Sequence, residues 1–237
     1  AVGISEPFKG VGTKLFLYDK ALKEMVGNEI DPDDPVLLAD AWDTLILGPA
    51  EEFREKLEGM GILGSDGAVL VGGDRICAPD YNMAPKMERH FPDIKTPWRY
   101  PNSGLMAGTG RAMRTFIHCL VEGSLDGATY TEDDDDQLRV QNFVYECQEQ
   151  GFRFPLSLDE DCRVFQNMGE PIVGWDFELA VPGTDSLPAV PPRICNHATG
   201  ERPVIVHGCG GHGRWFLSDI YRELELMNYL GVDPDRD

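Results

Sequence analysis

The sequence contains no long hydrophobic run. None approaches the roughly 20 apolar residues that a membrane-spanning helix needs, and the opening AVGISEPFKG lacks the apolar segment of a signal peptide. Repeats and low-complexity linkers are also missing, apart from an acidic run at Glu132–Asp136. The 237 residues are 42% hydrophobic and 26% charged, which excludes disorder, collagen and coiled coil. We therefore expect a globular chain with no membrane span, and its length suits one α/β domain.

Basic residues are scarce. The chain has 21 lysines and arginines against 41 aspartates and glutamates, a formal net charge of −20. Such a surface repels phosphate backbones, so we expect no sequence-independent binding to nucleic acid. If the ligand is itself an anion, a cation has to mediate its contact with the protein.

Several motifs that mark common enzyme and metal-site classes are also absent. The six cysteines form no CxxC pair, which argues against a structural zinc site. The patterns GxxxxGKS/T, GxSxG and HExxH do not occur, which excludes a P-loop and the commonest hydrolase and metalloprotease classes. An even number of cysteines is compatible with disulfides, so the redox compartment stays open.

Hydrophobic periodicity predicts helices that alternate with short buried strands. The helices are expected at residues 13–26, 49–60, 111–122, 134–150 and 214–230. The strands are expected at residues 36–39, 68–71, 103–107 and 204–207. This alternation is typical of a mainly parallel sheet flanked by helices, which binds ligands just beyond the carboxyl ends of its strands. Residues 168–202, rich in proline and glycine, are predicted to form a loop-rich insertion.

Two aspartates follow the first predicted strand. Asp40 and Asp43 come directly after VLLA, at a spacing that one tight turn can bring together. Two carboxylates so close repel each other unless a positive group lies between them, and a hard divalent ion that also binds substrate phosphates meets that need. The alternative is a turn with two solvated acids. Trp42 between them is either a core residue or a stacking surface for a flat ring.

A histidine ends the last predicted strand. His207 closes VIVH and is followed by Gly208, so an imidazole and a small residue meet at a strand end. Such a histidine is either structural or a ligand beside a closely approaching phosphate. Two carboxylates and one imidazole would suit Mn²⁺ better than Mg²⁺ or Ca²⁺.

The acidic run Asp133–Asp136 lies at the start of the helix predicted at 134–150. The simplest interpretation is that these acids cap the helix N-terminus. Four consecutive acids exceed what capping needs, so a functional carboxylate is the alternative: a base, an electrostatic stabiliser or an acceptor for sugar hydroxyls. Asn102, in the segment PNSG, fits an ordinary turn when it is considered alone.

Six segments in the same order resemble the glycosyltransferase domain of the procollagen lysyl hydroxylase family. They are VLLADAWDTLILGP, YPNSGLMAG, DDDDQL, RVFQN, PVIVHG and MNYLG, and the resemblance runs from about Gly12 to Gly231. It implies a GT-A type, Rossmann-like α/β fold in a single domain over residues 1–237. It also implies a metal-dependent transferase that uses a UDP-sugar.

The resemblance implies roles for the residues at the metal and the nucleotide. Asp40, Asp43 and His207 would hold Mn²⁺. Trp42 stands where the family has an aromatic residue near the uracil and would stack on the base. Lys14 falls where the family carries a basic residue in the nucleotide-binding region.

Further roles concern the sugar. Gly208 would let the backbone approach the diphosphate, and Asn102 would lie by the donor sugar. Asp135 and Asp136 would correspond to the family's essential carboxylates beside the transferred sugar. The implied reaction moves glucose or galactose to a hydroxyl of a protein or glycan acceptor, such as hydroxylysine or galactosyl-hydroxylysine. The implied location is the lumen of the secretory pathway, in the endoplasmic reticulum or Golgi.

The chain departs from the family pattern at two places. The family's N-terminal apolar strand is not seen here, and alanine replaces the family tryptophan in Cys77-Ala78-Pro79. These departures keep open a second function, a non-catalytic GT-A-like module that binds glycans or serves in assembly. A third function is a hydrolase of nucleotide sugars that uses the same metal.

Overall fold

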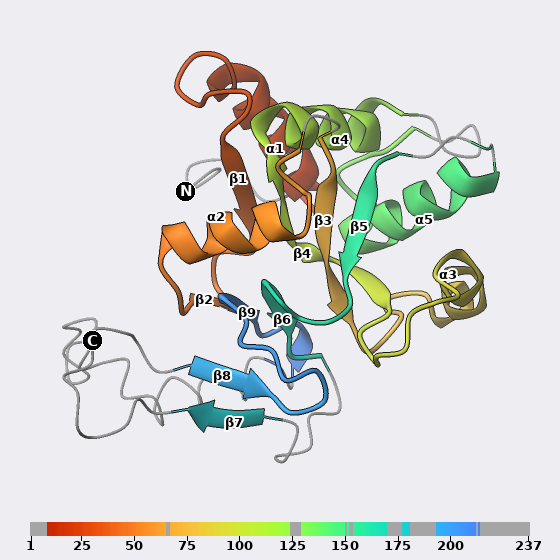
Figure 1. Ribbon diagram of the computed structural model, residues 1–237. Helices are drawn as coiled ribbons and strands as arrows, with labels where there is room; N and C mark the ends of the chain where they lie inside the picture. The colour runs from red at the N-terminus through yellow and green to blue at the C-terminus, as the bar shows by residue number, and fades with distance from the viewer. Residues whose placement is uncertain are drawn as a thin grey trace, which may run out of the picture.

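The computed structural model describes residues 9–64, 67–123, 129–149, 151, 154–169, 177–180, 193–211 and 213. Figure 1 shows a central sheet with helices packed on it and a smaller sheet beside it. The helical elements are α1 (Thr13–Met25), α2 (Ala50–Gly59), the 3₁₀ turn η1 (Tyr81–Met83), α3 (Ala84–His90), α4 (Gly110–Glu122) and α5 (Asp136–Glu149). The strands are β1 (Pro35–Ala39), β2 (Thr44–Ile46), β3 (Val69–Asp74), β4 (Tyr100–Thr109), β5 (Leu156–Asp159), β6 (Phe165–Asn167), β7 (Phe177–Ala180), β8 (Arg193–Asn196) and β9 (Ile205–His207).

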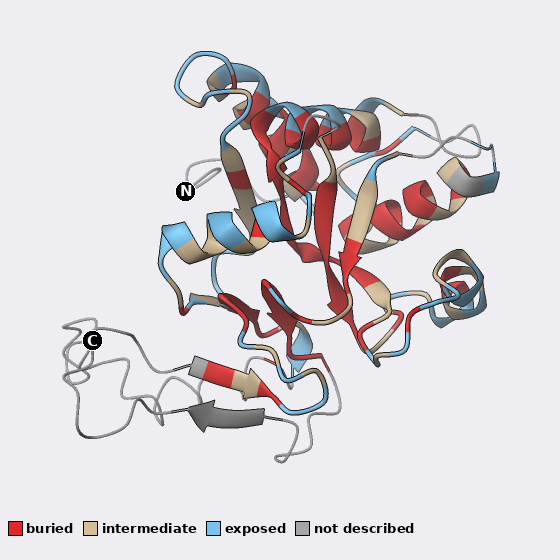
Figure 2. Cartoon of the chain, viewed as in Figure 1, coloured by how far each residue is buried: buried red, intermediate tan, exposed pale blue. Residues whose placement is uncertain are grey.

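The main sheet has the strand order β1-β4-β3-β5, and the smaller sheet has the order β2-β9-β6. Successive residues of a strand point to opposite faces, and the core divides accordingly. Val69 and Val71 of β3 pack with side chains of α1, α4 and α5 on one face of the main sheet. Leu70 packs on the other face with Leu57 of α2 and Phe165 of β6. Figure 2 shows the buried residues concentrated along the sheet and the helix sides that face it.

The predicted α/β fold is confirmed, but the sheets are mixed, where the sequence predicts a mainly parallel one. β4 runs antiparallel to both β1 and β3, whereas β5 is parallel to β3. In the smaller sheet β9 is antiparallel to β2 and parallel to β6. The reason lies in β4, which is central and almost entirely buried. A strand that is buried on both faces is apolar along its length whether its neighbours run parallel or antiparallel to it. The apolar pattern therefore does not distinguish the two strand directions.

Most predicted elements within the described residues are present. β3 extends beyond its predicted end at Val71, because Gly72 and Gly73 continue the pairing with β4 after a shift in register. The predicted helix at 214–230 lies outside the described residues. Within 168–202, β7 and β8 pair antiparallel. The loop-rich insertion, and the absence of the family's first strand, stay predictions.

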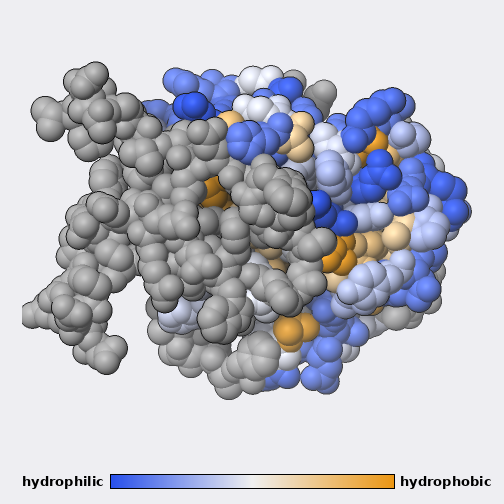
Figure 3. Space-filling model, turned by 90° about the horizontal axis from the view of Figure 1, so that it is seen from below, coloured by the Kyte–Doolittle hydropathy of each residue, from blue (hydrophilic) through white to orange (hydrophobic). Residues whose placement is uncertain are grey.

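The described part of the face seen from below is largely hydrophilic. In the view from below, hydrophilic side chains predominate among the described residues, with a few hydrophobic ones between them (Figure 3). Across the described ranges no helix combines the length and apolarity that crossing a membrane requires. The six cysteines all fall within the described ranges, and each is free.

Asp159 joins the main sheet to the smaller one. It ends β5, is buried, and accepts hydrogen bonds from the backbone N–H groups of Arg163, Val164 and Phe165 at 2.9, 2.8 and 2.7 Å. Burial raises the pKa of its carboxyl from 3.8 to about 6, although the three N–H donors oppose this shift. The folded protein therefore binds a proton here, between about pH 4 and about pH 6, that the unfolded chain releases.

The contribution of Asp159 to the free energy of unfolding should decrease as pH rises through this window. With Asp159→Asn as the reference, the wild-type protein should lose up to about 3 kcal/mol between pH 4 and pH 7, at about 1.4 kcal/mol per pKa unit. Urea denaturation across this range measures the difference. Asp161→Asn removes a half-buried acid from the same turn; it is the control and should show no such change. A relative gain in wild-type stability with pH would mean that the three N–H donors outweigh burial.

Candidate active site

The ends of several strands meet beside one cavity. β1, β3 and β9 end here, while the antiparallel β4 begins here, so residues at its start reach the same edge as those at its neighbours' ends. The N-terminal turns of α1 and α5 also line it, as do residues of the segments 76–81 and 209–211. The cavity has a volume of about 420 Å³, within the usual range of small-molecule sites. The predicted site residues that line it are Lys14, Asp40, Asp43, Asn102, Asp135, Asp136 and His207.

Asp40, Asp43 and His207 offer three ligand atoms within 4.8 Å of one another. Nε2 of His207 lies 3.7 Å from Oδ2 of Asp40 and 3.6 Å from Oδ1 of Asp43. These separations are too long for hydrogen bonds and suit atoms that surround a shared ion. Asp43 and His207 are buried, so their polar atoms have little access to water. The donor set of two carboxylates and one imidazole therefore fits a divalent metal ion such as Mn²⁺.

A lysine connects this group to the acidic run. Lys14 Nζ lies 2.9 Å from Oδ1 of Asp40 and 2.5 Å from Oδ2 of Asp136, which also accepts a 2.5 Å hydrogen bond from the Ser103 hydroxyl. Burial works to lower the pKa of Lys14, but the nearby Asp136 and Asp40 outweigh it and raise that pKa above its usual value. Lys14 therefore stays positively charged between the two carboxylates.

The acids of the run serve different purposes. Asp134 accepts from the backbone N–H of Thr131, and Asp135 accepts from the backbone N–H of Leu138 in the first turn of α5. Only the next residue, Asp136, is buried. The capping interpretation is thus right for Asp135, which also lines the cavity. Asp136 is the acid of the run that is buried in the cavity wall.

Asp74 is a cavity residue that sequence reasoning missed. It ends β3 and is buried, and its Oδ2 accepts hydrogen bonds from Asn102 Nδ2 at 2.8 Å and from the Cys209 thiol at 3.5 Å. Burial raises the pKa of the Cys209 thiol, and the negative charge of Asp74 raises it further. This thiol therefore stays protonated. The missed signal was VLVGGD, a strand that continues through two glycines to an acid.

Asn102 has both ends of its side chain engaged. Its Nδ2 donates to Asp74, and its Oδ1 accepts from the backbone N–H of Gly104 at 2.8 Å. The structure therefore places Asn102 in the cavity wall as a residue that orients Asp74. Its predicted contact with a donor sugar stays a prediction.

Trp42 and Gly208 lie beside the cavity but are not among the residues that line it. Trp42 is 97% exposed, which rules out the core alternative and leaves its flat ring accessible. The backbone N–H of Gly208 donates to the Asp43 carbonyl oxygen at 2.7 Å, so it fixes the turn that carries Asp43. Stacking of Trp42 on uracil, and approach of a diphosphate at Gly208, stay predictions.

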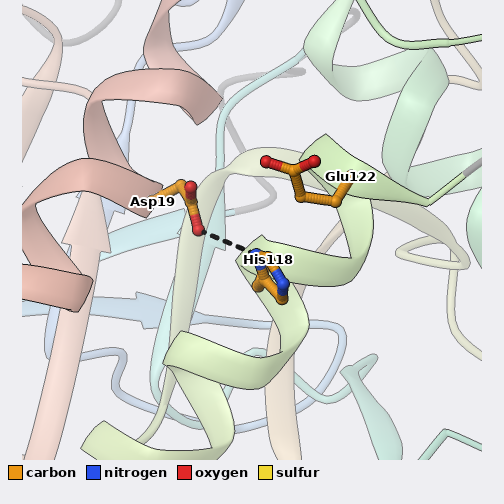
Figure 4. Close-up of side chains that lie close together, drawn as sticks. All are labelled: Asp19, His118 and Glu122. Atoms are coloured by element: carbon orange, nitrogen blue, oxygen red, sulfur yellow. Dashed lines mark ion pairs between the residues drawn. The ribbon is translucent and has the colours of Figure 1, made fainter.

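A second group of potential metal ligands lies between α1 and α4. Figure 4 shows Asp19 of α1 directed toward His118 of α4, with Glu122 one helical turn further along α4. Asp19 Oδ1 lies 3.4 Å from His118 Nδ1, while its Oδ2 pairs with Lys23 Nζ at 2.6 Å. Because Lys23 already compensates Asp19, and because the group contributes no residue to the cavity, the better metal candidate is Asp40, Asp43 and His207.

Comparison with known proteins gives the same family that the sequence segments resemble. The PLOD GT domain family matches residues 3–224. The rat "Multifunctional procollagen lysine hydroxylase and glycosyltransferase LH3" is 26% identical over 207 residues, which cover 85% of this chain and 23% of that protein. The rat "Procollagen-lysine,2-oxoglutarate 5-dioxygenase 1" is 24% identical over 203 residues, which cover 85% of this chain and 24% of that protein. The chain thus spans about a quarter of the length of these relatives.

Gly104→Ala should disturb the metal candidate directly. A Cβ at this position would lie 2.1 Å from Cε1 of His207, so the imidazole would have to move. We expect weaker binding of Mn²⁺ in a calorimetric titration and a loss of about 1–3 kcal/mol in the free energy of unfolding. Gly59→Ala, where a Cβ meets nothing within 4 Å, should leave both quantities nearly unchanged. Unchanged Mn²⁺ binding in Gly104→Ala would exclude His207 as a ligand.

Proposed function

This chain belongs to the PLOD GT domain family, and we propose that it transfers glucose or galactose from a UDP-sugar to a hydroxyl group with the help of Mn²⁺. The proposed acceptor is a hydroxyl of a protein or glycan, of the hydroxylysine or galactosyl-hydroxylysine kind. The name of the rat LH3 relative includes a glycosyltransferase, and its activity is extended to this chain as part of the proposal. Location in the lumen of the secretory pathway is proposed on the same family ground.

The observation that carries the proposal is the convergence of Asp40, Asp43 and His207 on a strongly acidic cavity. Aspartates dominate the charged residues in the cavity wall, and Lys14 is the one lysine among the described lining residues. A nucleoside diphosphate approaching this wall meets like charge, in a chain whose net charge is already −20. A divalent ion held by these three residues reverses the local sign and so makes the site fit for a diphosphate.

When bound, the metal supplies Lewis-acid stabilisation for the negative charge that develops on the departing UDP. Asp40, Asp43 and His207 would hold it. Lys14, fixed between Asp40 and Asp136, adds a second positive charge at the same end of the cavity. Together these residues orient the diphosphate.

Asp136 is the residue proposed to act at the transferred sugar. The Ser103 hydroxyl and the Lys14 ammonium both contact its Oδ2, which holds the carboxylate in one orientation. A carboxylate so placed stabilises positive charge on the sugar ring or accepts the proton of the incoming hydroxyl. Asp135, at the same edge of the cavity, is proposed to assist by accepting hydrogen bonds from sugar hydroxyls.

UDP release from a panel of UDP-sugars, with Mn²⁺ or with a chelator, tests the proposed class. We expect slow release that depends on Mn²⁺, is selective for UDP-glucose or UDP-galactose, and accelerates with a hydroxylysine-containing acceptor. Release of free sugar at one rate with or without acceptor would instead indicate a nucleotide-sugar hydrolase. Absence of UDP binding and of release with every sugar would favour the non-catalytic module.

Two substitutions should separate metal binding from transfer. Asp43→Asn should abolish the Mn²⁺-dependent part of UDP binding, because it removes a charged ligand. Asp136→Asn should keep UDP binding and lower transfer by about 10²–10⁴-fold, the range of acid–base contributions. Asp133→Asn removes the same charge from an exposed position in the same run, so its binding and transfer should match the wild type. Manganese-dependent UDP binding that survives in Asp43→Asn would show that the metal site is assigned wrongly.

A further inference from the structure

Asn167 ends β6, is buried, and uses both polar atoms of its side-chain amide. Its Nδ2 lies 2.9 Å from the Gly73 carbonyl oxygen, and its Oδ1 lies 2.8 Å from Nδ1 of His207. A carbonyl oxygen can only accept a hydrogen bond, so the amide nitrogen has to face Gly73. The opposite orientation would place Oδ1 against another oxygen. The orientation of the Asn167 amide is therefore fixed by the backbone of β3.

This orientation determines which nitrogen of His207 carries the proton. Because Oδ1 of Asn167 can only accept, Nδ1 of His207 has to donate to it. A neutral imidazole has one donor and one acceptor nitrogen, so Nε2 keeps its lone pair. Nε2 is also the atom that lies 3.6–3.7 Å from the carboxylates of Asp43 and Asp40.

The main sheet leaves little room for either side chain to move. A Cβ at Gly104 of β4 would lie 2.1 Å from Cε1 of His207, and a Cβ at Gly72 of β3 would lie 2.7 Å from Nδ2 of Asn167. Because glycine has no Cβ, Gly104 leaves room for the His207 imidazole and Gly72 leaves room for the Asn167 amide. The imidazole is held against β4 and the amide against β3.

The hydrogen bonds continue from Asn167 toward β8. Gln166 Nε2 donates to the Asn167 carbonyl oxygen at 3.0 Å, and Asn196 Nδ2 donates to Gln166 Oε1 at 2.8 Å. Asn196 is as deeply buried as Asn167, but its side chain hydrogen-bonds to Gln166 and to the backbone of Ala198 and Thr199. It therefore offers a comparison in which an asparagine supports the same region without contacting His207.

We propose that Asn167 is a positioning residue that fixes the proton of His207 on Nδ1 and thereby presents the Nε2 lone pair to the metal ion. The proposal rests on the metal-dependent function proposed above and adds the group that prepares the imidazole for it. Without Asn167, the proton is free to occupy Nε2, where its N–H would face the cation. Loss of such a partner of a metal-bound histidine typically costs 10–100-fold in metal affinity.

The tautomer is measurable in the protein without metal. Long-range ¹⁵N–¹H correlation spectra of the labelled full chain, at a pH where imidazole is neutral, distinguish a protonated from an unprotonated ring nitrogen. Through-bond correlations from the backbone assign the ring of His207 among the five histidines. We expect Nδ1 protonated and Nε2 unprotonated in the wild type, and a shift toward protonated Nε2 in Asn167→Ala. A calorimetric titration with Mn²⁺ alone should show 10–100-fold weaker binding in Asn167→Ala.

Asn196→Ala is the matched control for general damage. It removes an equally buried asparagine, so it should lower the free energy of unfolding, yet it should keep the wild-type tautomer and Mn²⁺ affinity. Equal losses of Mn²⁺ affinity in the two variants would overturn the proposal, because Asn167 would then act only through stability.

The wild-type spectrum tests the proposal even if Asn167→Ala does not fold. A wild type that binds Mn²⁺ with the proton of His207 on Nε2 would overturn the role of Asn167 and leave the proposed function standing. A wild type that has the expected tautomer but binds no Mn²⁺ would overturn the metal-dependent function, and with it the presentation of Nε2 to a metal.

Discussion

Repulsion among carboxylates gathered at one edge of the main sheet is the constraint on which the site depends. Asp40, Asp43, Asp74 and Asp136 all line a single cavity of about 420 Å³. Close carboxylates are stable only with positive partners or hydrogen-bond donors. Lys14 supplies the charge for Asp40 and Asp136, and backbone and amide donors hold Asp74. The proposed metal ion would add the remaining positive charge at Asp40, Asp43 and His207.

The smaller sheet completes the metal candidate. β9 carries His207, and β6 beside it carries Asn167, so the imidazole and the amide that contacts it come from neighbouring strands. Asp159 connects β5 of the main sheet to the start of β6 and the two residues before it through three backbone hydrogen bonds. The position of His207 against Asp40 and Asp43 therefore depends on how the two sheets are joined, and this junction is a structural requirement of the proposed chemistry.

Several site residues were predictable because their signals are local. Asp40, Asp43 and His207 follow or end apolar strands, and a strand end is where a ligand site is expected. Asp74 and Asn167 were missed as site residues for different reasons. The glycines before Asp74 look like the end of a strand, although they continue it. Asn167 looks like an ordinary polar residue after an apolar strand, and its importance arises from its contact with His207, which lies 40 positions away in the sequence.

The sequence by itself determined the α/β class, the positions of most helices and strands, and the acids and histidine available for chemistry, because periodicity and strand-end patterns depend on near neighbours. The tertiary structure alone decided the mixed strand directions, since buried apolar runs look alike in parallel and antiparallel sheets. It also decided how the acids of the run are used: Asp136 is buried against Lys14 and Ser103 in the cavity. Asp135 caps α5 and also lines the cavity, whereas Asp134 accepts a hydrogen bond from the backbone of Thr131. Contacts between distant segments make that selection, and no local pattern contains them.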